Sequence, residues 1–238
     1  MLGGRDEGVA ESFAFGGGEH GPSLSRAVPF AGAASDPRGT IAGMTDAKAR
    51  LHRDLRDCRE SLLWKLDGLG EYDLRRPMTP TGTNLLGLVK HVAGLESGYL
   101  GEAFGRPVDD PPWWFEHDMD EPNGDLWARA DETSDEITAF YRRVWAHSDA
   151  TIEMLGLEAA GRVPWWPAEE AEVTLHQMMV LMIGETNRHA GHADIVRELI
   201  DGSTGLRHDF RSVPEEGEAW WAAHRGRLEA TAREAAGW

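Results

Sequence analysis

The chain has 238 residues and is acidic, with 24 Lys and Arg against 41 Asp and Glu and a formal net charge of −17. A nucleic-acid-binding surface needs clustered positive charge, and a membrane span needs a run of about 18 apolar residues that the sequence lacks, so we expect a cytoplasmic protein that binds neither. The single cysteine, Cys58, excludes an internal disulfide and a thiolate zinc cluster.

Residues 1–43 differ in composition from the rest of the chain. They hold 10 of the 28 glycines and show no sustained apolar period. Gly-rich chain loses much entropy on ordering and buries little apolar surface in return. We therefore predict a disordered N-terminal extension, followed by one helical domain over residues 44–238.

Two long helices are predicted in the first half of this domain. Apolar residues at steps of three and four indicate one helix over about 45–69 and another over about 85–104. Thr83 or Asn84 can cap the second helix. Cys58 falls on the apolar face of the first, where we expect it to pack rather than react.

A long connection separates the second helix from the third. Residues 105–125 are dense in Pro and Asp, and their number exceeds the usual bundle loop, which indicates a crossover or a functional lid. The third helix is predicted over about 130–155. A Pro-flanked aromatic loop, 163–167, follows it.

The fourth helix has the clearest boundaries in the sequence. Thr174 and Gln177 form a capping-box pattern at its start, and Gly202 suits its end. A shorter tail helix is expected to follow, carrying Trp220 and Trp221. Four long helices without a predicted strand indicate an all-α fold, a four-helix bundle with an extra C-terminal helix.

The fourth helix also carries the residues with the strongest chemical pattern. Glu185, His189 and His192 are spaced i, i+4, i+7, so their side chains share one side of the helix. Apolar residues continue the same stripe, which predicts that it faces the bundle. Burying a carboxylate and two imidazoles without partners is costly, and a divalent metal is one solution, since Glu-x-x-x-His suits two ligands.

A third ligand must come from another helix, and His91 is the candidate. It lies one turn from Leu88 and Leu95, at the border of the second helix's apolar face. Three protein ligands with open positions describe a catalytic metal site. Zinc is the default for this donor set, and nickel or ferrous iron are compatible with it.

Other interpretations of the same residues stay open at this point. An interior histidine such as His91 is commonly a hydrogen-bonded core residue. Glu185 and His189 can form a simple helix-surface pair.

Four tryptophans in Pro-flanked segments, Trp113, Trp114, Trp165 and Trp166, could line the mouth of a pocket. Because large aromatic rings dominate packing, we favour a role in capping the bundle ends and filling the core. A dimer interface is a further alternative, which leaves a homodimer open.

Two segments carry a resemblance to a known family. LLGLVKHVAGLE over 85–96 and ETNRHAGHADIVRELIDG over 185–202 resemble the DinB-like superfamily of metal-binding four-helix bundles, in particular its mini-circle-protein branch. The resemblance extends over about residues 45–238.

The resemblance implies particular metal ligands. Carried over position by position, they are His91, Glu185 and His189. The commonest DinB-like pattern has His where Glu185 stands, whereas the related mycothiol-dependent maleylpyruvate isomerases carry Glu there. His192 falls where many relatives carry Gln, so we expect it beside the ligands rather than on the metal.

The resemblance also implies a reaction class. Relatives with known activity are isomerases or S-transferases that use mycothiol or a similar low-molecular-weight thiol, so we expect a metal-dependent S-transferase or isomerase that acts with such a thiol on a small electrophile. A metal-bound thiol loses its proton readily and becomes a nucleophile. The alternative is a non-catalytic metal- or small-molecule-binding bundle of the stress response. Only the enzyme predicts thiol-dependent turnover.

Overall fold

The computed structural model describes residues 47–117, 120, 122–211 and 213–238. All of these belong to one compact unit, Met44–Trp238. The expectation of a disordered extension over residues 1–43 lies outside the described residues. No helix in the described ranges has the length and apolar character that crossing a membrane requires.

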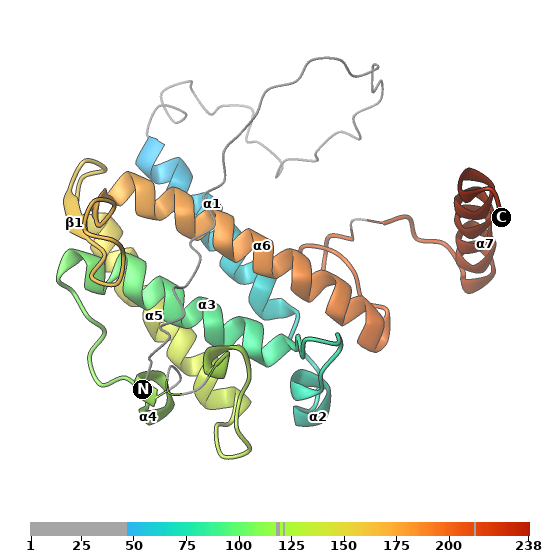
Figure 1. The fold of residues 1–238 in the computed structure, drawn as a ribbon, viewed down its shortest axis with the longest axis horizontal. Helices are drawn as coiled ribbons and strands as arrows, with labels where there is room; N and C mark the ends of the chain where they lie inside the picture. Colours follow the sequence, from blue (N-terminus) through green and yellow to red (C-terminus); the bar gives the residue numbers. More distant parts are fainter. Residues whose placement is uncertain (1–46, 118–119, 121, 212) are drawn as a thin grey trace, which may run out of the picture. The chain divides into compact units, whose positions relative to one another are not determined.

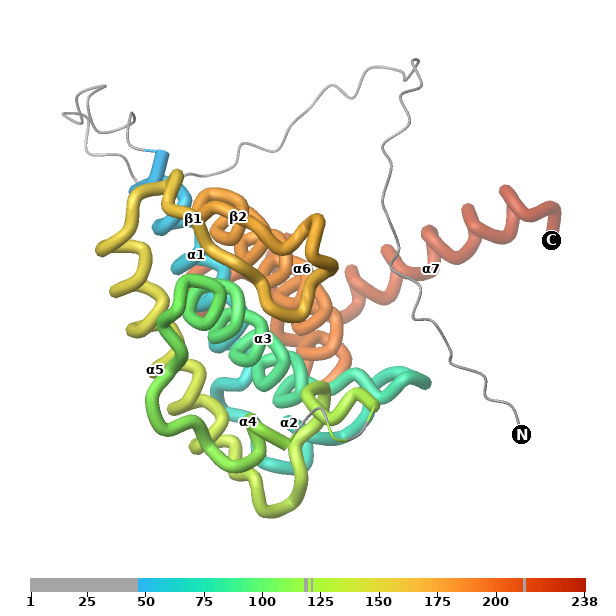
Figure 2. The backbone as a smooth tube through the Cα atoms, turned by 60° about the vertical axis from the view of Figure 1, so that its left-hand side comes forward, coloured from blue at the N-terminus to red at the C-terminus, as the bar shows by residue number. Residues whose placement is uncertain are grey.

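Four long helices form the body of this unit: α1 (Ala47–Trp64), α3 (Leu85–Leu100), α5 (Ser134–Met154) and α6 (Leu175–Asp201). Helix α6 packs on both α1 and α3, α3 packs on α5, and a smaller contact between α1 and α5 closes the bundle. Figures 1 and 2 show the four helices gathered side by side around a common interior. The expectation of an all-α bundle is therefore confirmed.

Apolar side chains at helical spacing fill this interior. Each of the four helices contributes fully buried apolar side chains. Burying one such side chain stabilises the fold by roughly 1.5–3 kcal/mol. Examples at 0% exposure, one from each helix in chain order, are Leu55, Val89, Val144 and Met182.

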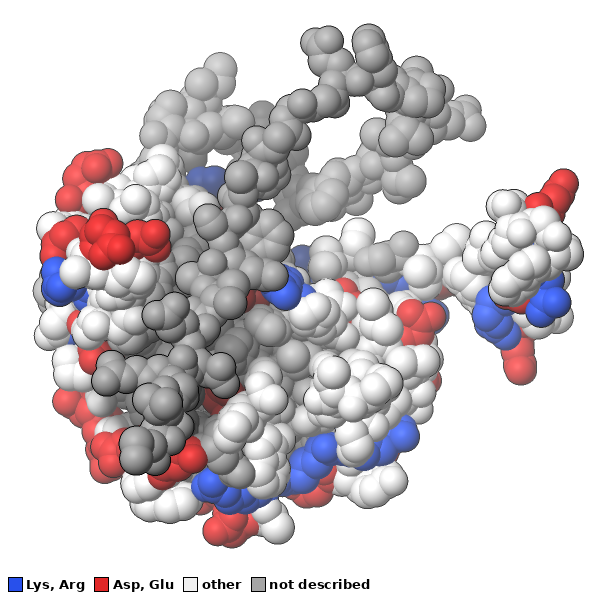
Figure 3. All heavy atoms as spheres, viewed as in Figure 1, with Lys and Arg blue, Asp and Glu red and all other residues white. Residues whose placement is uncertain are grey.

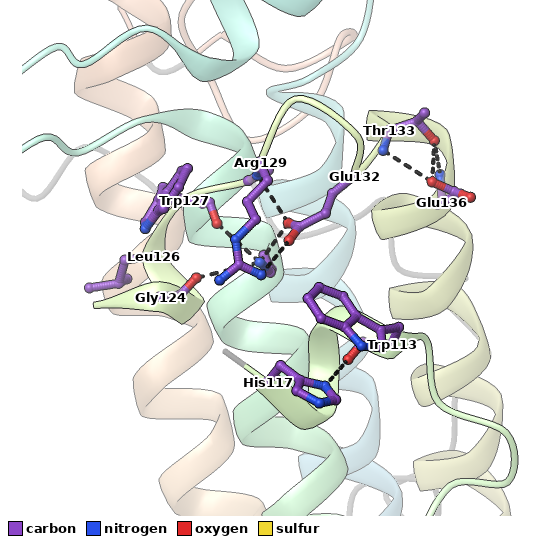
Figure 4. Close-up of polar contacts among 12 residues, drawn as sticks. Trp113, His117, Gly124, Leu126, Trp127, Arg129, Glu132, Thr133 and Glu136 are labelled. Carbon is purple, nitrogen blue, oxygen red and sulfur yellow. Dashed lines mark hydrogen bonds and ion pairs between the residues drawn. The ribbon is translucent and has the colours of Figure 1, made fainter. Parts of the chain in front are cut away.

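Polar caps set the helix boundaries. The Asn84 side chain accepts a hydrogen bond from the Gly87 amide at 2.8 Å and begins α3. Capping boxes begin α5 at Thr133 (Figure 4) and α6 at Thr174, the second as the sequence predicts. At the other end of α6, Gly202 has a φ of 76°, a conformation that favours glycine.

Two of the predicted helices end earlier than expected. The first stops at Trp64. The residues after it form turns in which an amide bonds to the carbonyl three positions earlier, as Lys65 N does to Leu62 O. The second stops at Leu100, and a separate 3-10 turn, η2 (Glu102–Phe104), follows it. The break lies at Gly101, where an added Cβ would overlap the Ser97 carbonyl oxygen.

The connections contain short helical pieces that the sequence pattern did not indicate. Helix α2 (Glu71–Arg75) lies between α1 and α3, while α4 (Trp113–His117) and the 3-10 turn η4 (Gly124–Leu126) lie between α3 and α5. Each is too short for a helical apolar period to be visible. The long connection is thus partly ordered, and η4 packs directly on α3.

A two-stranded hairpin corrects the expectation of a strand-free chain. Strands β1 (Ala160–Arg162) and β2 (Glu172–Thr174) pair antiparallel, with Gly161 opposite Val173. Three residues per strand leave no alternation to detect in the sequence. Gly161 is required by packing, because a Cβ there would lie 2.7 Å from the Phe104 ring.

The tail helix, α7, spans Glu218–Ala236, and none of its residues is buried.

On the face drawn in Figure 3, acidic side chains are spread over the described surface, while Lys and Arg gather mainly along its lower edge. The acidic charge is carried largely by such solvated carboxylates.

Candidate metal centre

His91 lies on α3 with its side chain 19% exposed, and Asp125 of η4 contacts its ring. The His91 Nδ1 atom is 2.6 Å from Asp125 Oδ2. The hydrogen bond from His91 holds the pKa of Asp125 below its ordinary value, although partial burial opposes this. An ionised carboxylate only accepts hydrogen bonds. His91 Nδ1 therefore donates, and in the neutral ring Nε2 keeps its lone pair.

His189 lies on α6 and meets His91 across the interface of the two helices. Their ring centroids are 4.8 Å apart at an interplanar angle of 71°, and the His189 side chain is buried. Burial, followed by the proximity of His91, lowers the pKa of His189 to about 4. Its ring is thus neutral at pH 7, which is the metal-binding form. Its Nδ1 atom is buried and has no hydrogen-bond partner among the described residues.

Glu185 and His192 lie on either side of His189 along α6. Glu185 Oε2 is 3.6 Å from His189 Nε2, too long for a hydrogen bond, and the neutral imidazole makes no ion pair with it. The centroids of the His189 and His192 rings are 5.4 Å apart, and His192 is exposed. The expected neighbours are therefore brought together, but at different depths.

The depth difference corrects the expectation that all three residues face the core. The buried face of α6 is centred on Thr186 and Ala193, both at 0% exposure. At 100° per residue, this centre places Glu185 and His192 at the edge of the buried face. Only His189 of the three is buried, so the site opens along that edge.

The donor types fit a divalent metal, whereas their present arrangement does not form a full ligand set. Two imidazoles and a carboxylate suit zinc, nickel or ferrous iron. The Nδ1 atom of His189, which is buried without a hydrogen-bond partner among the described residues, could serve as a metal ligand. Over the ranges that the structure describes, no three or more His, Cys, Asp or Glu residues are placed so that they could hold a metal ion together. Binding by His91, Glu185 and His189 would thus involve side-chain rearrangement.

Comparison with known proteins identifies the family. Residues 50–202, which include all four helices of the bundle except the first residues of α1, match the family described as Mycothiol-S-transferase. The chain belongs to this family. The resemblance to DinB-like bundles expected from the two sequence segments is thereby confirmed.

One solved structure supports the fold of this mycothiol S-transferase family member. The crystal structure of a conserved protein from Enterococcus faecalis is similar over 66% of this chain and 99% of its own, with a TM-score of 0.51 and 15% sequence identity. At this identity the likeness establishes a shared fold alone. No curated protein matches the chain.

Cys58 does not supply a reactive sulfur to this mycothiol S-transferase family member. The thiol is buried on α1 and donates to the Leu55 carbonyl oxygen at 3.1 Å. Burial raises the pKa of Cys58 to about 12, so the thiolate is negligible at pH 7.

The tryptophans of the long connection have different exposures. Trp114 is buried, and its ring packs on Phe140 with centroids 5.3 Å apart, whereas Trp113 is 60% exposed. Both line a hollow of about 580 Å³ together with Arg143 and three acidic residues just before and in the first turn of α5, Asp131, Glu132 and Glu136. Trp114 therefore fills the core, as we favoured, and also forms a pocket wall.

Trp165 and Trp166 of the hairpin loop pack on α3 instead. Their rings lie 5.5 and 5.7 Å from the Tyr99 ring between centroids, and the Trp166 indole donates to the Tyr99 hydroxyl at 3.3 Å. Trp165 also approaches Gly98, where an added Cβ would lie 2.8 Å from the indole. These contacts cover the second half of α3.

Sequence reasoning missed two features near His91. The first is Asp125, whose 34-residue separation from His91 hides the contact; the Asp-rich connection was the one available signal. The second is a hollow of about 570 Å³, formed by residues before and at the start of α3 and by Pro122–Trp127. Its lining is Thr81, Gly82, Thr83, Asn84, Leu88, Pro122, Asn123, Leu126 and Trp127.

Proposed function

We propose that this protein is a metal-dependent S-transferase that joins a mycothiol-type thiol to a small electrophile. His91, Glu185 and His189 are the proposed ligands of a divalent metal, with zinc the first candidate. His192 is proposed to contact the ligands from the exposed side. Assembly as a homodimer is part of the same proposal.

One observation carries this proposal. In a chain of the mycothiol S-transferase family, the His91 and His189 rings from two different helices lie 4.8 Å apart between centroids. His189 brings a neutral, buried nitrogen without a hydrogen-bond partner in the described structure. Metal coordination satisfies such a nitrogen and explains why two imidazoles are placed together beneath an open edge.

The residues of the chain would bind and orient the reactants. His91, held by Asp125, and the buried His189 would present imidazole nitrogens from fixed helices, while the half-exposed Glu185 would contribute a carboxylate. A divalent ion held there would lower the pKa of an added thiol and favour its thiolate.

The sulfur must come from the co-substrate, because Cys58 is buried and protonated. In the transfer, the thiol loses its proton to solvent water, its sulfur forms a bond to the electrophilic carbon, and the leaving group departs with the electrons of the broken bond. A co-substrate could lie in the hollow between the start of α3 and residues 122–127, since Leu88, which lines it, is one turn from His91.

Metal content is the first test. Full-length protein purified without an affinity tag is expected to bind about one equivalent of zinc, measured by elemental analysis after zinc loading and dialysis. His91→Ala and His189→Ala should each lose it. His176→Ala is the matched control, because His176 is an exposed histidine on the same helix α6. A wild-type protein that cannot be loaded with zinc, nickel or ferrous iron rejects the proposed site.

Thiol-dependent turnover is the second test. Zinc-loaded protein is assayed for loss of mycothiol in the presence of an aryl halide, with bacillithiol as a parallel thiol. We expect turnover by the wild type and the His176→Ala variant but not by His189→Ala. Stoichiometric zinc without turnover of any thiol would instead favour a non-catalytic metal-binding bundle.

A further inference from the structure

Asp125 reaches His91 from a segment that lies on the side of α3, not from a neighbouring long helix. Its carboxylate accepts from His91 Nδ1 at 2.6 Å, so that in the neutral ring Nε2 is the nitrogen with an available lone pair. In metal sites, a carboxylate on the far nitrogen of a ligating histidine sets the tautomer and the orientation of the ring. The structure contains this arrangement at a histidine whose ring centroid lies 4.8 Å from that of His189.

The backbone around Asp125 is attached to α3 by specific polar contacts. The Asn84 side chain donates to the Leu126 carbonyl at 3.2 Å. Lys90 Nζ lies 3.4 Å from the Gly124 carbonyl oxygen and 3.1 Å from that of Trp127. The carbonyl groups on both sides of Asp125 are therefore held by side chains of, or just before, the helix that carries His91.

A buried ion pair fixes this attachment. Lys90 Nζ is 2.6 Å from Glu132 Oε2, with the two side chains 1% and 4% exposed. The ammonium also lies 4.9 Å from the centroid of the Trp114 ring. Figure 4 shows Gly124, Trp127 and Glu132 converging on one small region of the structure. Because separating a buried charge pair leaves an unpaired charge, the segment resists displacement from α3.

Close packing adds a steric constraint to these polar contacts. Gly87 lies under η4, and a Cβ at this position would overlap the Leu126 carbonyl oxygen. Any residue other than glycine at position 87 would push the segment that carries Leu126 away from α3. The distance from Asp125 to His91 is therefore determined by backbone packing as well as by the hydrogen bond itself.

We propose that Asp125 is the positioning residue for the metal ligand His91, and that the Lys90–Glu132 pair holds it in place. Asp125 keeps the proton on His91 Nδ1 and directs Nε2 to the metal. This inference rests on the proposed metal site, but it assigns a role to a residue outside the ligand set. The alternative is a surface contact that contributes only to stability.

The test uses full-length protein and two readouts. Long-range ¹H–¹⁵N NMR of the metal-free protein reports the His91 tautomer, with His91→Gln to assign its signals, and calorimetry reports zinc affinity. Asp125→Ala is expected to shift His91 away from the Nδ1–H form and to weaken zinc binding about 10- to 100-fold. Asp67→Ala is the matched control, because it removes an Asp contact to a different histidine, His208 Nε2, at 3.1 Å.

The outcomes separate the two proposals. If Asp125→Ala keeps the tautomer, or changes it without weakening zinc binding, the positioning role is wrong. Asp125→Asn retains an oxygen acceptor and is expected to lose less affinity than the Ala variant, which keeps the test decisive if Asp125→Ala folds poorly. A wild type that binds none of zinc, nickel and ferrous iron rejects the proposed function, and the NMR comparison alone then decides whether Asp125 controls His91.

Discussion

The Arg59 guanidinium and the Glu96 carboxylate form a two-bond ion pair in the interior of the bundle. Arg59 Nη2 is 2.6 Å from Glu96 Oε1 and Arg59 Nε is 3.0 Å from Glu96 Oε2, and both side chains are 0% exposed. The pair links α1 to α3, the helix that carries His91. It is therefore part of the framework that positions the candidate site.

Breaking this pair on one side should strongly destabilise the fold. Glu96→Ala leaves the Arg59 charge buried with less compensation, so we expect a loss of about 3–5 kcal/mol in the free energy of unfolding, measured by urea denaturation. The double variant Arg59→Met, Glu96→Leu removes both charges and should lose less than Glu96→Ala alone. A double variant less stable than the single one would contradict this account.

The acid sensitivity of the fold should depend on Asp149. Burial alone would raise the pKa of Asp149, but hydrogen bonds from Arg59 at 2.7 Å and His52 at 2.8 Å hold it below its ordinary value. A carboxyl with a depressed folded-state pKa stabilises the fold above its unfolded pKa of about 3.9. That contribution is lost as the pH falls through the folded-state pKa.

Unfolding free energies at pH 7 and at pH values below about 4 test this dependence. Asp149→Asn should be less stable than wild type at pH 7, and the gap should narrow in acid. Asp209→Asn is the control, because Asp209 is exposed and Arg207 is its ion-pair partner. An equal gap at every pH would show that the Asp149 charge does not contribute.

The capping box of α6 should contribute measurably to stability. The Thr174 hydroxyl accepts from the Gln177 amide at 3.3 Å, and Gln177 Oε1 accepts from the Thr174 amide at 2.8 Å. Thr174→Ala removes the first bond and should cost about 0.5–2 kcal/mol. Thr174→Ser, which retains the hydroxyl, should recover most of the loss in the same urea titration.

Two glycines on α3 should respond oppositely to the same substitution. Gly87→Ala places a Cβ against the Leu126 carbonyl oxygen, so we expect a loss of about 1–3 kcal/mol from the forced shift and weaker zinc binding. At Gly94 the nearest atom is a Phe115 ring carbon at 3.9 Å. Gly94→Ala should therefore be neutral or stabilising by up to about 1 kcal/mol. Equal effects would contradict the close approach of η4.

Cys58 should be inert in the folded protein. With the thiol buried and its pKa raised to about 12, alkylation by iodoacetamide at pH 8 should be slow without denaturant and fast in urea, as mass spectrometry would show. Cys58→Ala should retain thiol-dependent turnover. Rapid alkylation of the native protein, or loss of turnover at unchanged stability, would implicate Cys58 in the reaction.

Helix positions were predictable where the local signals agree. The start of α6 at Thr174 and its end at Gly202 follow from capping patterns that act within four residues. The ends of α1 and α3 were predicted too late, because apolar residues such as Leu66 remain buried after the helix has ended. A periodic apolar pattern reports burial, and burial continues into turns that pack on the same core.

The candidate ligands were predictable in identity but not in depth. Spacing placed Glu185, His189 and His192 on one side of α6, and the order of the motifs pointed to His91. Which of the three enters the interior depends on how α6 rotates against α1 and α3, and that rotation is determined by packing. The result is one buried histidine, His189, between an exposed His192 and a half-exposed Glu185.

By itself, the sequence determined the acidic bundle, its four long helices and the residues with metal-binding chemistry, because these depend on composition and on contacts within a few residues. The tertiary structure alone decided that Asp125 meets His91 and that Arg59 pairs with Glu96. Both contacts join residues more than thirty positions apart. Such pairs form only when helices and connections pack, since no local pattern encodes which distant charge will lie within hydrogen-bonding distance.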